Sequence, residues 1–273
     1  MDILQIIILG IVQAVTEWLP LSSKTMDTVV YTQFFGGSME NVVGMLLFLH
    51  LGTLLAAAAY FRKEISRVAK GFLRSPSNWA EHKRTEAGFL IVALVMTGVV
   101  GAPILAIEVF LLPGLDASAL FMLMGAGLVA TGFLLSSQRK NRFRSALSAA
   151  AEDGILTGAL QGLSVIPGVS RAGCTTTALI FSGFDAESAF HLSFLLSIPT
   201  VLAAEIVLWG YQFATGAAGN LPLLDGLMLA ASSFFFGYLT IGALLKFAKD
   251  INVSSLAFLF GIMMLAFGLF GIG

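Results

Sequence analysis

Two polar breaks interrupt the apolar stretches of this sequence, and each contains side chains that can do chemistry. In the first break, Gln13 and Glu17 lie four residues apart on one face of a helix that ends near Pro20. Ser22 and Ser23 follow, and either hydroxyl can cap a second short helix. A carboxylate within a membrane segment costs about 2.5–3.5 kcal/mol on insertion scales. In such a segment, Glu17 therefore needs a partner, a water-filled cavity or a chemical role.

The second break is rich in small and hydroxyl-bearing residues. It contains Pro167, Gly168, Ser170, Arg171 and Thr175. These residues open a short helix, whose free backbone N–H groups and positive dipole end favour an anion. Arg171 adds a planar guanidinium group that matches phosphate oxygens. The break therefore predicts a phosphate or other anion site. An Arg171–Glu17 ion pair that only joins the two breaks is a second interpretation, and the two are compatible.

The composition places both breaks in a membrane protein. Apolar residues make up 57% of the 273 residues and charged residues 11%, and the mean hydropathy is +0.91. An average soluble domain has about 25% charged residues, so a soluble fold is excluded. Intrinsic disorder is excluded as well, because it needs low hydrophobicity and high charge. The net charge of −1 gives no reason to expect a nucleic-acid partner.

Six apolar stretches are long enough to span a bilayer, which takes about 20 residues. They lie near 41–61, 86–109, 117–136, 188–209, 225–246 and 254–272. Two shorter stretches, 3–16 and 154–166, each run into a polar break and then a second short apolar stretch. Non-helical backbone at membrane depth is tolerated only where protein or water covers it. We therefore predict an all-α polytopic membrane protein with six transmembrane helices and two re-entrant helical hairpins.

Basic residues predict the orientation. All of the 15 Lys and Arg residues except Lys24 and Arg171 lie in three loops, at 62–84, 139–144 and 246–249. These loops fall on one side of the predicted membrane, which the positive-inside rule makes cytoplasmic. The opposite loops contain no Lys or Arg. We therefore expect a multi-pass protein of the cell (plasma) membrane with both termini outside.

The two hairpins carry an internal repeat. The segment Gly-Ile-Val-Gln at 10–13 recurs as Gly-Ala-Leu-Gln at 158–161, and a serine lies nine residues after each glutamine. With the orientation above, the first hairpin enters from outside and the second from inside. We therefore predict one membrane domain, 1–273, with inverted repeat halves at about 1–136 and 150–273. Such repeats place a binding site near the bilayer midplane, where the hairpin tips meet.

Other polar residues within the apolar stretches have simpler interpretations. His50 and His191 each lie near the start of a short pattern that the two halves share, and we interpret both as hydrogen-bonded helix residues rather than ligands. Glu205 needs a polar neighbour that the sequence does not identify. From the residues alone, the chain is a membrane protein with a midplane anion site, either an enzyme or a carrier.

The two breaks resemble the motifs of the undecaprenyl pyrophosphate phosphatase family, also called BacA or UppP. The first motif is Gln13-x-x-x-Glu17 with Leu19-Pro20-x-Ser22-Ser23, and the second is Pro167-Gly168-x-Ser170-Arg171 with Thr175. The resemblance extends to 50–55, to 193–199 and to the order of spans. It implies two re-entrant hairpins in an inverted repeat. It also implies removal of one phosphate from a C55 polyprenyl diphosphate, which regenerates the monophosphate carrier lipid for cell-wall synthesis.

The resemblance implies a role for each motif residue. Ser23 matches the nucleophile, and Glu17 matches the acid that activates this serine or helps to hold a divalent cation, Mg²⁺ or Ca²⁺. Gln13 occupies a position that is Glu or Gln in the family. The diphosphate is expected to bind Ser170, Arg171 and Thr175, and Arg171 is expected to take part in catalysis with Glu17 and Ser23. From the same breaks we ourselves expect four further contacts, from Gln13, Ser22, Lys24 and Gly168.

Two departures separate this chain from the family pattern. Met26 stands where the family has a histidine with an acid–base role, and Ala172 stands where it has a serine. Lys24 and Asp27 are additions at the first break. Lys24 can bind a phosphate, and Asp27 can replace the lost titratable group.

Three functions remain open at this point. The first is a polyprenyl-diphosphate phosphatase, and the alternative is a non-catalytic polyprenyl-phosphate flippase or carrier of the same fold. A purely structural subunit is hard to reconcile with Glu17 and Arg171 at membrane depth. The sequence also leaves open whether the protein is a monomer or a homodimer.

Overall fold

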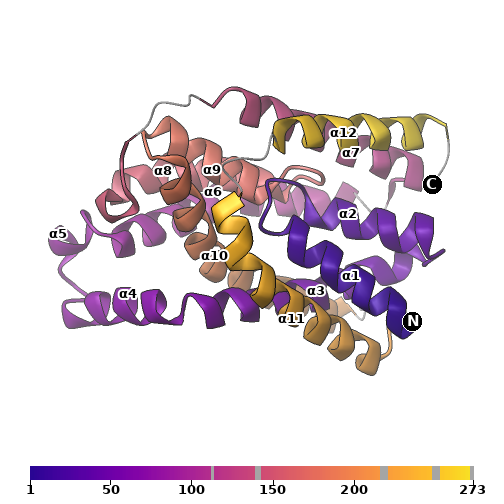
Figure 1. Cartoon of the computed structure of the whole chain (residues 1–273), viewed down its shortest axis with the longest axis horizontal. Coiled ribbons are helices and arrows are strands. Elements are labelled where there is room, and N and C mark those ends of the chain that lie inside the picture. Colours follow the sequence, from indigo (N-terminus) through magenta and orange to yellow (C-terminus); the bar gives the residue numbers. More distant parts are fainter. Residues whose placement is uncertain (112–113, 139–142, 216–220, 248–252, 271–273) are drawn as a thin grey trace.

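The protein is built from helices, as the sequence predicts (Figure 1). The computed structural model describes residues 1–111, 114–138, 143–215, 221–247 and 253–270. Within these ranges no β-strand forms, and the isolated bridge between Arg144 and Phe184 is a local contact between two loops. The basic loop residues Arg139, Lys140, Arg142 and Lys249 lie outside the described residues.

Five helices are long and apolar enough to cross a membrane. They are α3 (Val42–Tyr60), α6 (Glu86–Leu111), α7 (Ala117–Ser136), α10 (Ala186–Thr215) and α11 (Leu223–Phe247). Their positions agree with five of the predicted spans. The sixth prediction is only partly met, because α12 (Val253–Leu269) has 17 residues, about 26 Å. The described residues therefore contain five full-length spans and, in place of the sixth, this shorter apolar helix.

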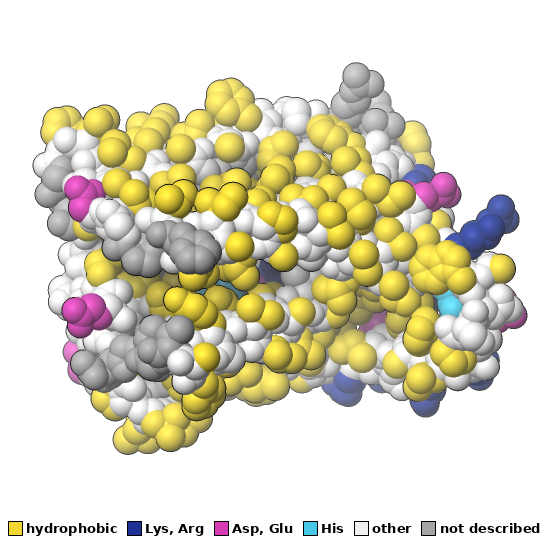
Figure 2. All heavy atoms as spheres, turned by 180° about the vertical axis from the view of Figure 1, so that it is seen from behind, with side chains coloured by type: hydrophobic (Ala, Val, Ile, Leu, Met, Phe, Trp, Pro, Cys, Tyr) yellow, Lys and Arg dark blue, Asp and Glu magenta, His cyan; other side chains and the backbone are white. Residues whose placement is uncertain are grey.

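The outer surface of the bundle is apolar (Figure 2). Large side chains on the outer faces of the long helices are exposed, among them Val99, Phe133, Ile206 and Leu239. On the face in Figure 2, Lys and Arg side chains gather at the end that carries α4 (Arg62–Arg74) and α5 (Trp79–His82). The N-terminus and the described end of α12 lie at the opposite end of the bundle (Figure 1). An apolar belt between two polar ends is the surface of a membrane-embedded protein.

Two helical hairpins form where the sequence predicts them. The first consists of α1 (Ile3–Thr16) and α2 (Ser23–Val29), extended by a π-helical turn at Val30–Phe34. The second consists of α8 (Ala151–Gly162) and α9 (Arg171–Phe181), joined through a 3₁₀ turn, Leu163–Val165. α1 has 14 residues and α8 has 12, which is about 21 Å and 18 Å of helix. Neither can cross the roughly 30 Å of a bilayer core.

Each hairpin packs against a long helix from the other predicted half. A Cβ atom at Gly10 of α1 would lie 2.1 Å from the Ser232 hydroxyl oxygen of α11. A Cβ atom at Gly158 of α8 would lie 2.2 Å from the Ala93 carbonyl oxygen of α6. These two glycines occupy the same place in the sequence repeat, so matched residues make matched close approaches. The division of the chain into inverted halves stays a prediction.

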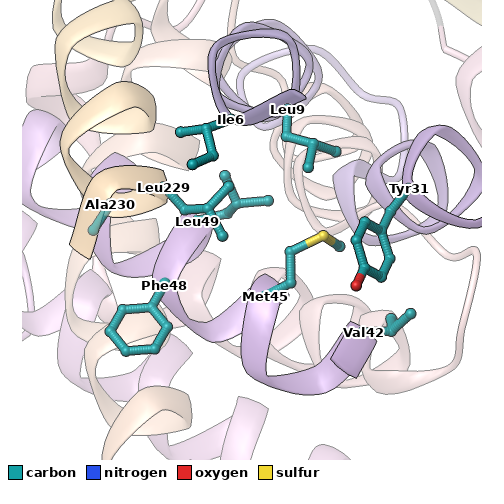
Figure 3. Close-up of a cluster of buried hydrophobic side chains, with 9 residues drawn as sticks. All are labelled: Ile6, Leu9, Tyr31, Val42, Met45, Phe48, Leu49, Leu229 and Ala230. Atoms are coloured by element: carbon teal, nitrogen blue, oxygen red, sulfur yellow. The ribbon is translucent and has the colours of Figure 1, made fainter. Parts of the chain in front are cut away.

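A buried apolar cluster fixes the first hairpin (Figure 3). Ile6 and Leu9 of α1 point toward Met45 and Leu49 of α3 and toward Leu229 of α11 (Figure 3). The five side chains are at most 1% exposed. Because Gln13 and Glu17 continue this inward face of α1, the cluster sets where their side chains lie.

Arg144 holds the base of the second hairpin. Its guanidinium donates two 2.8 Å hydrogen bonds to the Asp153 carboxylate of α8 and a third to the Ser182 carbonyl oxygen after α9. It also lies 4.2 Å over the centre of the Phe184 ring. Hydrogen bonding to Asp153 raises the pKa of Arg144 above its usual value, so the cation persists at any physiological pH. Both ends of the hairpin are thus tied to one side chain.

Replacing Arg144 with methionine should destabilise the fold, because it leaves the Asp153 carboxylate, 6% exposed, without its partner. Removing one partner of a buried pair costs about 3–5 kcal/mol, and the exposure of Arg144 favours the lower end. The midpoint of thermal unfolding in detergent should fall by several degrees. Arg74→Met, at an exposed position near the end of α4, is the matched control. Equal midpoints for the two variants would contradict this role.

Candidate functional site

The tip of the first hairpin presents an acid and a serine to each other. α1 ends beside Glu17, and the chain turns through Pro20 before Ser22 begins α2 in an extended conformation. The Ser23 hydroxyl donates a 2.7 Å hydrogen bond to Oε2 of Glu17. Gln13 approaches the same oxygen at 3.4 Å. The predicted neighbourhood of Gln13, Glu17 and Ser23 is therefore present.

Helix α9 begins at the tip of the second hairpin, beside the tip of the first hairpin. Gly168 has φ +88°, and a Cβ atom there would lie 2.0 Å from the Met124 carbonyl oxygen of α7. Only glycine fits this turn. The Ser170 side chain then caps α9 by accepting a 3.2 Å hydrogen bond from the Gly173 amide. The first amides of α9, those of Arg171 and Ala172, have no acceptor within the helix.

An ion pair joins the two tips. Nη2 of Arg171 donates a 2.7 Å hydrogen bond to Oε1 of Glu17. The other terminal nitrogen of Arg171, Nη1, is buried and has no hydrogen-bond partner among the described residues. The pair therefore uses half of the guanidinium fork, and the other half remains for an anion. Both interpretations of Arg171 from the sequence are thus compatible with this geometry.

The remaining predicted residues divide into two groups. Ser22 is buried and accepts a 3.0 Å hydrogen bond from the Thr25 hydroxyl, whereas Lys24 is exposed at the same tip. Thr175 lies one turn into α9, where its hydroxyl bonds Ser193 of α10 and the Arg171 carbonyl oxygen. Thr175 therefore fastens α9 to α10 with the groups described here. No described contact places Thr175 at the tip.

The structure adds three residues that the sequence did not assign to the site. The Thr53 hydroxyl of α3 accepts a 3.1 Å hydrogen bond from Gln13. The Thr131 hydroxyl of α7 accepts a 3.0 Å bond from the Ser170 amide and so holds the second tip. His50 of α3, interpreted above as an ordinary helix residue, directs Nε2 toward Oε2 of Glu17 at 3.6 Å. Thr53 lies one helical turn after His50, and this spacing is the one signal that could have linked them to the site.

A crevice too narrow to admit a water molecule lies beside Glu17, between α3 and α10. Besides Glu17, it is lined by Trp18, Thr53, Leu54, Ala57, Ser197 and Val201. Most of these side chains are apolar.

The described residues do not by themselves build a divalent-cation site. No group of three or more His, Cys, Asp or Glu side chains gathers within the ranges that the structure describes. Both oxygens of Glu17 already accept hydrogen bonds, from Arg171 and from Ser23. Asp27 is fully buried, and neither of its carboxylate oxygens has a hydrogen-bond partner among those residues. A cation at Glu17 would have to displace one of the present contacts or take its ligands from a bound phosphate.

Fold and site together define a polytopic membrane protein in which an acid, a serine and an arginine meet between two hairpin tips. The chain belongs to the BacA family, since the family model described as "Bacitracin resistance protein BacA" matches residues 6–270. The relatives include the undecaprenyl-diphosphatase of Methanococcoides burtonii, 37% identical over 91% of each chain. That of Saccharolobus solfataricus is 37% identical over 96% of this chain and 94% of its own. Undecaprenyl-diphosphatase 2 of Halalkalibacterium halodurans is 34% identical over 94% and 92%.

Arg171→Lys tests the free half of the guanidinium. A lysine keeps the charge and can still pair with Glu17, but it has no second nitrogen in a fixed fork. We expect near-parental thermal stability and about tenfold weaker binding of inorganic diphosphate in isothermal titration calorimetry. Lys63→Arg, on the exposed surface of α4, serves as the control. Unchanged affinity in Arg171→Lys would mean that Nη1 does not bind the anion.

Proposed function

We propose that this protein is a polyprenyl-diphosphate phosphatase that releases one phosphate and regenerates the monophosphate carrier lipid. The observation that carries the proposal is the unpaired Nη1 of Arg171 beside the hydrogen-bonded pair of Ser23 and Glu17. The names of the three relatives support the same activity. The hydrogen bond from Ser23 to Glu17 favours a phosphatase over a carrier, because a carrier does not need a serine hydroxyl held on a carboxylate.

The anion binds at the second tip in this proposal. The terminal phosphate approaches Nη1 of Arg171 and the free amides at the start of α9, where the helix dipole favours negative charge. These groups are held in place before substrate arrives, by the ion pair with Glu17 and by Thr131. Fixed donors of this kind stabilise the charge that spreads over the phosphoryl oxygens during transfer. Ser22, Lys24 and Thr175 stay predicted contacts to the diphosphate.

The chemistry takes place at the first tip. The Ser23 oxygen attacks the terminal phosphorus, and the bond from phosphorus to the bridging oxygen breaks. The Ser23 proton leaves toward Oε2 of Glu17, which accepts its hydrogen bond. Water then releases orthophosphate from the serine, which regains a proton. The prenyl chain extends along the crevice between α3 and α10, whose opening must widen to admit it.

The proposal includes a divalent cation that would bind together with the substrate diphosphate. Mg²⁺ commonly takes one or two carboxylates together with substrate phosphate oxygens, so the diphosphate would supply ligands that the described residues lack. If bound, such a cation would neutralise charge on the diphosphate as the prenyl monophosphate leaves. We also propose a place in the cell membrane with the basic loops in the cytoplasm and both termini outside. A homodimer stays a prediction without a structural test.

Phosphate release from a C55 and a short prenyl diphosphate tests the activity directly. We expect release by the parent protein, a loss of more than about 10³-fold in Ser23→Ala, and a loss of about 10²–10³-fold in Arg171→Ala. Ser38→Ala, at an exposed position outside both tips, is the control. Addition of EDTA should abolish release, and Mg²⁺ or Ca²⁺ should restore it.

Absence of release from the parent with every metal and both substrates would overturn the phosphatase proposal. Transport of the monophosphate lipid in vesicles would then be the next measurement. Release that EDTA does not affect would remove the cation from the proposal and leave the serine chemistry standing.

Labelling of single cysteines tests the orientation. The labelled cysteines are introduced in a Cys174→Ala background. Ser77→Cys places one in the basic segment between α4 and α5, and Ser38→Cys places one in the segment that precedes α3. In intact cells, a membrane-impermeant maleimide should label position 38 and leave position 77 unlabelled until the membrane is opened. The reverse pattern would contradict the assignment of the basic loops to the cytoplasm.

A further inference from the structure

His50 faces the reacting pair from a third helix. Its side chain is 12% exposed and lies on α3, outside both hairpins. Nε2 lies 3.6 Å from Oε2 of Glu17, the same oxygen that accepts the Ser23 hydrogen bond at 2.7 Å. Oε2 therefore stands between the serine hydroxyl and the imidazole. Distances of this kind often shorten when substrate closes a site.

One contact fixes which ring nitrogen of His50 carries the proton. Nδ1 lies 2.8 Å from the Leu46 carbonyl oxygen, one turn earlier on α3. A carbonyl oxygen can only accept, so Nδ1 carries the hydrogen and donates it. In the neutral ring, Nε2 then has a lone pair that points toward Glu17. The helix backbone thus orients the imidazole to receive a proton from this direction.

Glu17 is a poor final destination for the serine proton. Arg171 donates to its other oxygen at 2.7 Å, and this contact favours the charged carboxylate. A proton that passes from Ser23 to Oε2 therefore tends to move on. Nε2 of His50 lies 3.6 Å from Oε2, so His50 is placed to take this proton.

The motif position where the family has a histidine cannot do this in the present chain. Met26 packs in an apolar cluster with Val29, Phe121, Leu128 and Met264. It has no group that binds or releases a proton. An imidazole reaches Glu17 from α3 instead.

We infer that His50 is the proton relay of this site and acts through Glu17, an inference that rests on the proposed phosphatase function. As the Ser23 oxygen bonds to the terminal phosphorus, its proton moves to Oε2 of Glu17 and then to Nε2 of His50. The bridging P–O bond breaks, and the prenyl monophosphate leaves with the bond electrons. In the second step, water attacks the phosphoserine and gives one proton to the released phosphate. The proton on His50 returns by the same route to Ser23 as its bond to phosphorus breaks.

His191 provides the matched control. It lies in the same short sequence pattern on α10 as His50 does on α3. Its ring packs edge to face on Phe61, with ring centres 5.4 Å apart, and it makes no ion pair with an acid among the described residues. If replacing any histidine on α3 or α10 lowered the activity, the loss would appear in the variants of both residues.

Three variants separate the relay from a purely structural role. His50→Asn keeps an amide N–H near Nδ1 for Leu46 and removes Nε2. His50→Gln places an amide near Nε2, which can donate a hydrogen bond to Glu17 but cannot carry a proton away. We expect kcat for prenyl diphosphate to fall roughly 10²-fold in both, with KM within about twofold of the parent. His191→Asn should keep parental kcat and KM, and all three should keep the parental unfolding midpoint.

The outcomes are distinct. Parental kcat in His50→Asn would overturn the inference, and parental kcat in His50→Gln would show that a hydrogen-bond donor suffices and would overturn the relay as well. A rise in KM with unchanged kcat would assign His50 to binding and reject the relay. If His50→Asn has a lowered unfolding midpoint, His50→Gln decides alone. Failure of the proposed function is separate, because it appears as no release from the parent itself.

Discussion

The ion pair between Glu17 and Arg171 joins two hairpin tips that lie 154 residues apart in the chain. Neither charge can remain alone among apolar helices, because an unpaired charge at membrane depth is costly. The pair is therefore the constraint to which the surrounding packing conforms. Gly10 and Gly158 allow the hairpins to approach the long helices closely enough for the tips to meet. Arg144 fixes the far end of the second hairpin, so its tip has little freedom to withdraw.

The pair also divides its atoms between structure and chemistry. Oε1 of Glu17 holds Arg171, while Oε2 accepts from Ser23. Nη2 of Arg171 holds Glu17, while Nη1 has no partner among the described residues. A buried donor without a partner destabilises the free protein, and a bound anion would remove this cost. The contact between Oε1 of Glu17 and Nη2 of Arg171 thus holds the other two atoms, Oε2 and Nη1, in place for a ligand.

The two hairpins use similar sequence patterns for different purposes. The first helix of each hairpin carries a glycine and a glutamine at matched positions, and both glutamines bond a threonine of a neighbouring helix. The first tip then supplies an acid and a serine, whereas the second supplies a cation and helix amides. The histidines differ in the same way, since His50 faces Glu17 and His191 packs on Phe61. A repeated backbone plan therefore gives a site whose two sides are chemically complementary.

The helices, the hairpins and the main residues of the site follow from the amino-acid sequence. Long apolar runs can satisfy their backbone only as helices, and the two runs that lead into the polar breaks form only short ones, α1 and α8. Glu17 and Arg171, one in each break, had to find partners. Their pairing was one interpretation of the sequence, and the tertiary structure confirms it. That Thr131 holds the second tip and that His50 turns toward Glu17 became visible only in the folded chain. Such contacts depend on how each helix is rotated against its neighbours, and apolar helices with little amphipathic pattern carry no sequence signal for that rotation.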